Sequence, residues 1–303
     1  MTSSRKLKFD IVKRRAIFVS AHKLAIYHWH KGDLASSYLF DVNQDGQAFF
    51  DRYLKETPNN PVYILIDLFE EEFKQETAPH VFGRDREAII ERKKARLFRD
   101  TPYYTYKVQG REEEGRKDDI LMLSAITNPE LILPWLEILQ QNKVPIVGLT
   151  SVPLLTESLI KLLPDLGENN LVVSIQSISG LRQTFIKDGQ LRVSRLVQLP
   201  RYGTEPYGPH ISEEVDKIKR YLASVRLIST DVSESQRLNI YFLLNGEVLD
   251  ELREEYKEIS TTGMHFLDIN DLLNNAGSER QVTSPFSDQL FVHQLLKTRP
   301  ANA

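Results

Sequence analysis

The residues with the clearest chemical potential lie in a stretch that alternates, turns and alternates again, from Val172 to Leu196. The Asp188-Gly189 pair in its middle predicts a β-hairpin. The first strand of this hairpin leads into the small residues 177–180, and some nucleotide-binding folds place an aspartate and a phosphate loop at such a point. The polar positions of this strand are Ser174 and Gln176. The sequence therefore leaves three interpretations open, namely a phosphate site, the remains of one, or a plain hairpin.

Other residues that could do chemistry have a simpler explanation. His28 and His30 share one face of a predicted strand. A zinc site needs three or four ligands, and no third one is identifiable nearby, so we expect an exposed strand face instead. The acidic runs 70–72 and 112–114 are typical of solvated faces or loops.

Several classes of activity lack any sequence support. No Ser-His-Asp elbow, P-loop, HExxH or dinucleotide fingerprint occurs. The absence of cysteine excludes disulfides, thiolate metal sites and cysteine nucleophiles. Tyr103, Tyr104 and Tyr106 could stack on bases, but the flanking acids and the net charge of −3 favour burial in a strand, so we expect no nucleic-acid partner. Arg182, Arg192 and Arg195 are expected to form surface ion pairs.

Composition and length describe an ordinary globular protein. The 303 residues are 41% hydrophobic and 27% charged, enough for one large domain or two moderate ones. No apolar run approaches the roughly 20 residues that cross a bilayer. The basic segment Arg5–Arg15 is expected to be a solvated leader, with contact to acidic lipid headgroups as the alternative.

Hydrophobic periodicity predicts the same succession of elements in both halves. In the first half we expect strands at 16–21, 23–30 and 35–42, a helix at 44–55, a strand at 62–66, a polar stretch, a charged helix at 84–99, strands at 103–108 and 120–126, a helix at 130–142, a strand at 144–149 and a helix at 154–163. In the second half we expect strands at 171–178, 181–187 and 190–199, a helix at 213–227, a strand at 238–244, a helix at 248–255, a strand at 264–267, and helices at 269–275 and 286–296.

This doubled βββαβαβα order predicts the fold class, an α/β duplicated ribonuclease-H-like (actin-like ATPase) fold with two lobes, each built on a mixed sheet. The predicted boundaries are 1–152 for the first lobe, 153–285 for the second, and 286–303 for a C-terminal helix that packs back on the first lobe. The charged helix at 84–99 and the loop at 111–119 are expected to be insertions, and as variable surface elements they would suit docking.

Particular segments strengthen this interpretation. Together they resemble actin-like cytoplasmic components of type IV pilus assembly and type II secretion (PilM and the cytoplasmic domain of GspL), and the resemblance covers most of the chain. It is carried by segments Asp67–Phe73, Pro79-His80, Gly83–Arg86, Ala88–Phe98, Asp100–Tyr103, Asn128-Pro129, Pro134-Trp135, Val147–Leu155 and Gly180–Leu196.

The resemblance implies an adaptor at the cytoplasmic side of the inner membrane. Its expected partners are inner-membrane pilus or secretion proteins. Some proteins of this sort bind ATP and others have lost that ability. In some, a membrane helix follows the cytoplasmic domain, which implies an anchor beyond Ala303 as an alternative to peripheral membrane contact.

The fold also implies where a nucleotide would bind. Actin-like ATPases enclose the phosphates between two hairpins, each with an aspartate on its strand for the hydrated Mg²⁺. In the first hairpin, Ser20 stands at the acid position and Lys23 is placed to neutralise a phosphate, although a lysine at a turn is typically solvated. In the second, Ser174 replaces the acid.

Small polar residues persist beyond these positions. Ser177, Ser179 and Gly180 keep the turn of the second hairpin, and Asn245-Gly246 is the nearest match to the glycine pair that contacts adenosine, or else a tight turn. Loss of both acids predicts an inactive ATPase fold that works as a scaffold with no catalytic residue, no metal and no cofactor. The alternative is an actin-like protein that binds ATP with Mg²⁺, if only weakly, and whose cleft closure regulates partner binding.

Overall fold

This computed structural model describes residues 14–30, 33–98, 101–229, 237–257, 263–278 and 281–297. Residues 1–13, with most of the basic leader, and Ala303 lie outside these residues. The first sheet has three antiparallel strands followed by two parallel ones. The strand order is β3-β2-β1-β4-β8. Its strands are β1 (Arg14–Val19), β2 (Lys23–His30), β3 (Asp33–Asp41), β4 (Val62–Ile66) and β8 (Ile146–Ser151). Arg14 and Arg15 begin β1, and Arg15 is buried, so the expected solvated leader is wrong at that position.

Helices cover both faces of this sheet because its central strands are apolar on both sides. Helices α1 (Gln44–Glu56) and α3 (Leu133–Gln141) pack on one face, where Phe50 and Trp135 join Ile17 in a common core. Helices α4 (Val152–Leu159) and α8 (Asp288–Lys297) pack on the other face. Short 3₁₀ turns lie at Pro129–Leu131 and Ile160–Leu162.

The second sheet repeats this arrangement with the order β11-β10-β9-β12-β13. Helices α5 (Tyr207–Ser224) and α6 (Gly246–Glu255) cover one face, and the other face packs on α4, α7 (Ile269–Asn275) and α8. Its strands are β9 (Asn169–Gln176), β10 (Gly180–Lys187), β11 (Gln190–Val197), β12 (Leu238–Leu244) and β13 (Met264–Asp268).

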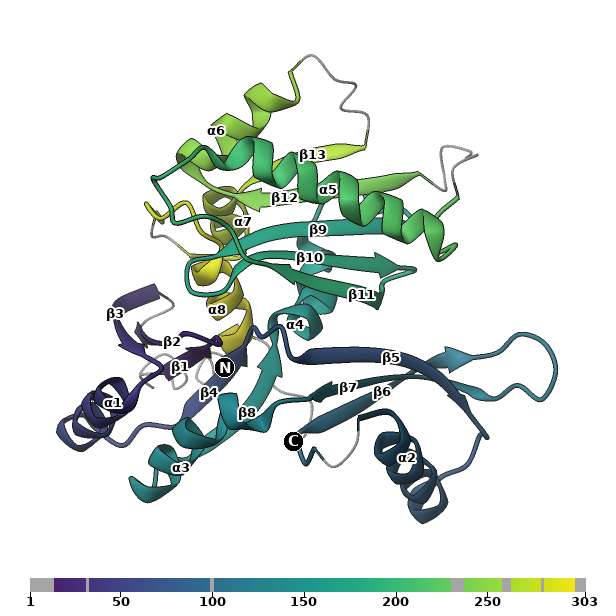
Figure 1. Ribbon diagram of the computed structural model, residues 1–303, viewed down its shortest axis with the longest axis horizontal. Helices are drawn as coiled ribbons and strands as arrows, with labels where there is room; N and C mark the ends of the chain where they lie inside the picture. The colour runs from purple at the N-terminus through teal and green to yellow at the C-terminus, as the bar shows by residue number, and fades with distance from the viewer. Residues whose placement is uncertain are drawn as a thin grey trace, which may run out of the picture.

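Each sheet thus has an antiparallel meander whose first strand pairs in parallel with later strands. This confirms the predicted fold class, a duplicated ribonuclease-H-like fold with a mixed sheet in each lobe (Figure 1). The lobe boundaries at 152/153 and 285/286 stay predictions. Helix α8 contacts β1, β4 and α4, and Figure 1 shows it between the two sheets.

A third, three-stranded sheet projects from the first lobe (Figure 1). We call it the insertion; it consists of β5 (Glu71–Ala78), α2 (Gly83–Phe98), β6 (Tyr104–Arg111) and β7 (Asp119–Ile126), with strand order β5-β7-β6. The sequence prediction treated 71–78 as a polar stretch without structure. That was wrong, because only Glu71 and Ala78 at the two ends of β5 are buried and the polar middle hides the strand pattern.

The two lobes share one hydrophobic core. Phe18 of the first sheet and Ile186 and Tyr241 of the second belong to the same cluster, and Phe291 of α8 lies within it. No helix among the described residues has the length and apolar character needed to span a bilayer.

Candidate functional site

The first hairpin closes on itself. Ser20 is buried, and its Oγ accepts hydrogen bonds from the amides of His22 (3.3 Å) and Lys23 (3.1 Å). The Ser20 amide donates to the Lys23 carbonyl at 2.9 Å. Lys23 itself is half-exposed, with Nζ 3.8 Å from the Asp41 carboxylate on β3. The polar groups of this turn are therefore occupied by the turn and its neighbouring strand.

The second hairpin directs its serines at carboxylates from distant parts of the chain. The amide and the Oγ of Ser177 donate to Asp288 at 3.0 and 2.8 Å, and the Oγ of Ser179 donates to Asp67. Ser174 is buried on β9 and accepts from the side-chain amide of Gln176 at 3.0 Å. The turn that would cradle a phosphate thus holds two of the protein's own acids.

Gly180 begins β10 directly after this turn. It has φ +116°, and a Cβ there would lie 2.5 Å from the Val197 carbonyl oxygen on β11. Glycine is therefore required by close backbone approach within the sheet. This requirement exists without any bound phosphate, so the glycine by itself does not indicate a nucleotide.

Asn245 and Gly246 organise the start of α6. Asn245 Oδ1 accepts from the Gly246 amide at 2.9 Å, which caps the helix. Its Nδ2 donates to the carbonyls of Val282 (2.7 Å) and Ser284 (3.1 Å). The side chain thereby fastens the segment that leads to α8 and serves a structural role.

The same segment lies across the ends of two strands of the second sheet. The Ser287 amide donates to the Ile175 carbonyl at 2.7 Å, and its Oγ donates to the Leu243 carbonyl at 2.6 Å. Ligands of open α/β sheets bind beyond the carboxyl ends of the strands. In this protein the approach to α8 occupies the carboxyl ends of β9 and β12.

Asp288, the first residue of α8, is buried beside Tyr27 of β2 and bonds to the exposed Ser177. The Tyr27 hydroxyl lies 3.4 Å from Asp288 Oδ1. Burial raises the pKa of Asp288 above its ordinary value, and the hydrogen bonds from Ser177 and Tyr27 oppose that rise. Burial also raises the pKa of Tyr27, and the nearby Asp288 carboxylate adds to it. Three elements of both lobes therefore meet at this carboxylate.

Arg182 and Asp67 form a second buried connection between the lobes. Arg182 on β10 is 2% exposed, so the predicted surface ion pair is wrong for this residue. Its Nη2 lies 2.6 Å from Asp67 Oδ1, its Nε 2.8 Å from the same oxygen, and Nη2 also donates to the Leu68 carbonyl at 3.0 Å. Burial raises the pKa of Asp67, while Arg182 and Ser179 counteract the rise. Arg195 does form the predicted kind of half-exposed pair, with Glu214 at 2.7 Å.

A third buried acid, Glu71, lies beside this pair at the start of β5. Ser124 on β7 donates to its Oε1 at 3.3 Å. Burial raises the pKa of Glu71 to about 7, opposed by Arg182 and Ser151 and reinforced by Asp67.

Sequence reasoning missed all three acids as members of a site. Asp67 directly follows the buried strand β4, and Asp288 opens a helix, but those signals are common at element ends.

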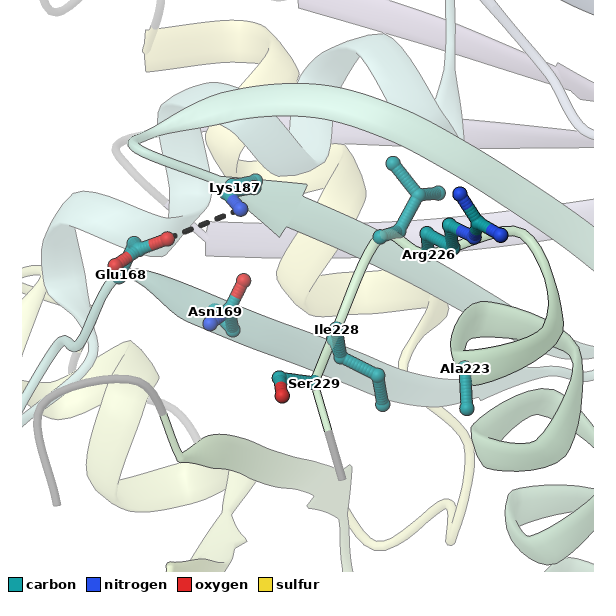
Figure 2. A pocket seen from close by; sticks show the side chains of 8 residues that line it. Glu168, Asn169, Lys187, Ala223, Arg226, Ile228 and Ser229 are labelled. Carbon is teal, nitrogen blue, oxygen red and sulfur yellow. Dashed lines mark ion pairs between the residues drawn. The ribbon is translucent and has the colours of Figure 1, made fainter. Parts of the chain in front are cut away.

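Two cavities lie away from these acids. One, of about 330 Å³, is lined by Tyr202, Tyr207 and the carboxylate-bearing Glu205, Glu247 and Glu251. Because Glu247 directly follows Gly246, the predicted adenosine contact borders an acidic pocket. Figure 2 shows the other, of about 380 Å³, where Lys187 and Glu168 form an ion pair at 3.0 Å. It adjoins Asn169, at the opposite end of β9 from the hairpin turn.

The remaining candidates have structural partners. His28 is half-buried and bonds to the Tyr53 hydroxyl, which corrects the expected exposed face. Within the described ranges, no group of three or more His, Cys, Asp or Glu residues could hold a metal ion. Tyr104 packs on α2, with Lys94 Nζ 4.2 Å from its ring centre, whereas Tyr106 is exposed, so the expected burial in the strand is wrong for Tyr106.

Comparisons with known proteins agree with the fold. No protein-family model matches the chain, and neither does any curated protein. Among solved structures, a PilM-PilN type IV pilus biogenesis complex matches with a TM-score of 0.62 and 13% identity, over 94% of this chain and 98% of the other.

Two further solved structures are similar to a lesser degree. A Bacteroides thetaiotaomicron protein with an actin-like ATPase fold matches with a TM-score of 0.46 and 11% sequence identity, over 87% of this chain and 93% of the other. The other is the cytoplasmic domain of EpsL, an inner-membrane component of the Vibrio cholerae type II secretion system. It matches with a TM-score of 0.43 and 12% sequence identity, over 81% of this chain and 94% of the other.

At these identities the likeness concerns the fold. The chain has the two-lobed actin-like fold, and the resemblance to PilM-like proteins is confirmed at that level.

Proposed function

We propose that the protein is a catalytically inactive actin-like scaffold on the cytoplasmic side of a pilus or type II secretion assembly platform. The observation that carries this proposal is that the Asp288 carboxylate accepts hydrogen bonds from the amide and the hydroxyl of Ser177. In an actin-like ATPase, donors of this kind in a hairpin turn bind phosphate oxygens. In this protein the carboxylate of Asp288, which belongs to the same chain, binds those donors instead of a phosphate.

The chemistry of the cleft supports the same proposal. Hydrolysis needs carboxylates that organise Mg²⁺, yet Ser20 and Ser174 stand at those positions and both are buried in bonds within their own hairpins. Asp67 is held by Arg182 and Ser179, and so it is not available as a base. The carboxylates beside Gly246 would also repel a polyphosphate.

The assembly context rests on the structural match at a TM-score of 0.62. That structure is a PilM-PilN type IV pilus biogenesis complex. A protein that has lost nucleotide chemistry but kept both lobes retains surface for a partner protein. We therefore expect an inner-membrane pilus or secretion protein as partner, and a cytoplasmic location at the inner-membrane face.

A titration with Mg-ATP tests the inactive state. A ligand that binds only the native state at 100 times its Kd raises the free energy of unfolding by about 2.7 kcal/mol. We expect thermal shift and calorimetry to show no change in Tm and no heat of binding at millimolar Mg-ATP. A rise in Tm that Lys23→Ala abolishes, and that the exposed control Lys55→Ala keeps, would favour the nucleotide-regulated alternative instead.

A further inference from the structure

Glu71 lies where the first lobe, the second lobe and the insertion meet. It begins β5 and is 8% exposed. The groups around it are Asp67 after β4, Ser124 on β7, Ser151 at the end of β8 and Arg182 on β10. Lys107 and Glu157, which pair at 2.6 Å, line a cavity of about 200 Å³ beside Ser124. All three parts of the molecule therefore contribute to the surroundings of this one carboxyl group.

The charges at this junction do not balance when both acids are ionised. Arg182 is the buried cation of the junction, and Asp67 already accepts from its Nε and Nη2. Among the described residues, Glu71 has one hydrogen bond to Oε1 and none to Oε2. A buried carboxylate without a charge partner is costly and tends to take up a proton. Glu71 therefore fits the junction best as a neutral carboxylic acid.

The insertion depends on this junction and on a band of polar contacts to the second lobe. Gln109 on β6 donates to the Leu191 carbonyl at 3.2 Å, and Gln190 donates back to the Gln109 carbonyl. Glu157 accepts from Lys107 and from the Leu191 amide at 2.7 Å. The contacts of Gln109 and Lys107 are polar and partly exposed, so water can replace them at low cost, whereas the bond of Glu157 to the Leu191 amide is buried and belongs to the two lobes.

We propose that Glu71 is a proton-sensitive latch, which in its neutral form holds the insertion against both lobes and in its ionised form loosens that junction. Loss of the proton places a second negative charge beside Asp67 and draws Arg182 between two carboxylates. The insertion is joined to the second lobe by replaceable polar contacts and to the core of the first lobe by Ile126 at the end of β7, and its outer part is then the part that moves. This inference does not depend on which assembly the protein serves.

The pH dependence follows from the direction of the pKa shift. In the unfolded chain Glu71 titrates near its ordinary value, and in the folded protein near 7. The native state therefore binds the proton more tightly, and this contribution is full below about pH 4.5 and is lost as the pH rises through 7.

Denaturant unfolding of the full chain between pH 4.5 and 8 tests the latch, with Glu71→Gln as the neutral mimic. We expect the unfolding constant of the wild type, relative to that of E71Q, to increase on the order of 100-fold over this range. Hydrogen exchange, corrected for its intrinsic pH dependence, should show peptides 67–78 and 104–111 losing protection toward pH 8 in the wild type but not in E71Q.

Glu76→Gln is the matched control, because Glu76 lies on the same strand but pairs with Lys93 and Arg96 near the surface. E76Q should keep the wild-type decline in stability and protection. Ser124→Ala, which removes the hydrogen bond to Oε1, should move the transition to higher pH. Equal pH profiles for the wild type and E71Q would overturn the proposal, as would a loss of stability that leaves exchange in the insertion unchanged.

Discussion

Ser177 and Ser179, which the sequence marks as remnants of a phosphate turn, both bond to carboxylates of the same chain. The acids they meet, Asp288 and Asp67, come from a helix and a strand end more than 100 residues away. A hydroxyl and an amide that would suit an anionic ligand suit an anionic side chain equally well. At the scale of single residues, these donors bind anions that the chain itself supplies.

The Asp67–Arg182 pair should respond to mutation as a buried ion pair. Asp67→Ala leaves the guanidinium of a 2% exposed arginine without a counter-charge, so we expect a loss of about 3–5 kcal/mol in the free energy of unfolding. Urea denaturation of D67A, R182A and the double variant should show strong non-additivity, with the double variant losing less than the sum.

The exposed pair of Asp250 and Arg253 on α6 provides the control. These groups lie 3.1 Å apart, but both side chains are at least half exposed. Asp250→Ala should leave stability nearly unchanged. Additive losses at Asp67 and Arg182 would show that the pair is not coupled as the structure indicates.

At the scale of elements, α8 is the helix that fixes the second hairpin. It follows a segment bonded to β9 and β12, its first residue binds the turn of the hairpin, and its apolar face fills the core between the sheets. Its docking therefore depends on the polar contacts of Asp288 at its start and on apolar burial along its length.

Asp288→Ala should release the start of α8. The substitution leaves the amide of Ser177 without its carboxylate acceptor, and because Ser177 is exposed and water can reach it, we expect a loss of about 1 kcal/mol. Chemical denaturation should show this loss, and hydrogen exchange should increase in peptides covering 286–297. Asp45→Ala, in the exposed first turn of α1, is the control and should change neither measurement beyond a small helix-end effect. Unchanged exchange in α8 would contradict the proposed role of Asp288.

At the scale of the whole molecule, the lobes are joined by a hydrophobic core rather than by a mobile cleft. The cluster that contains Phe18, Tyr241 and Phe291 takes residues from both sheets and from the C-terminal helix. Two buried polar junctions, at Asp288 and at Asp67, add to it. Cleft closure that depends on a nucleotide would have to break these contacts.

We therefore expect the two lobes to unfold in one transition. Both tryptophans lie on first-lobe elements, Trp135 in the core of that lobe and Trp29 in the core that the lobes share, so their fluorescence reports on the first lobe and on its junction with the second. Ile211→Ala, in the core under α5 of the second lobe, should cost ~3 kcal/mol and lower the fluorescence midpoint together with the far-UV circular dichroism midpoint. A fluorescence transition that stays in place while circular dichroism shifts would show that the lobes unfold separately.

The sequence by itself determined the repeated order of strands and helices and the turns of both hairpins. These features depend on local periodicity and on residues such as Asp188-Gly189, whose effects act over a few positions. It also predicts that Ser20 and Ser174 stand at the positions where actin-like ATPases have acids. The sequence did not predict the strand at 71–78, because its polar middle shows no alternation of apolar and polar residues.

Only the tertiary structure decided what those residues contact. Arg182 looked like a surface arginine because its hairpin alternates, yet the second lobe turns that face onto Asp67, 115 positions away. Asp288 reaches Ser177 across 111 positions. Pairings over such distances follow from how the sheets and α8 pack together, and local sequence patterns carry no record of that packing.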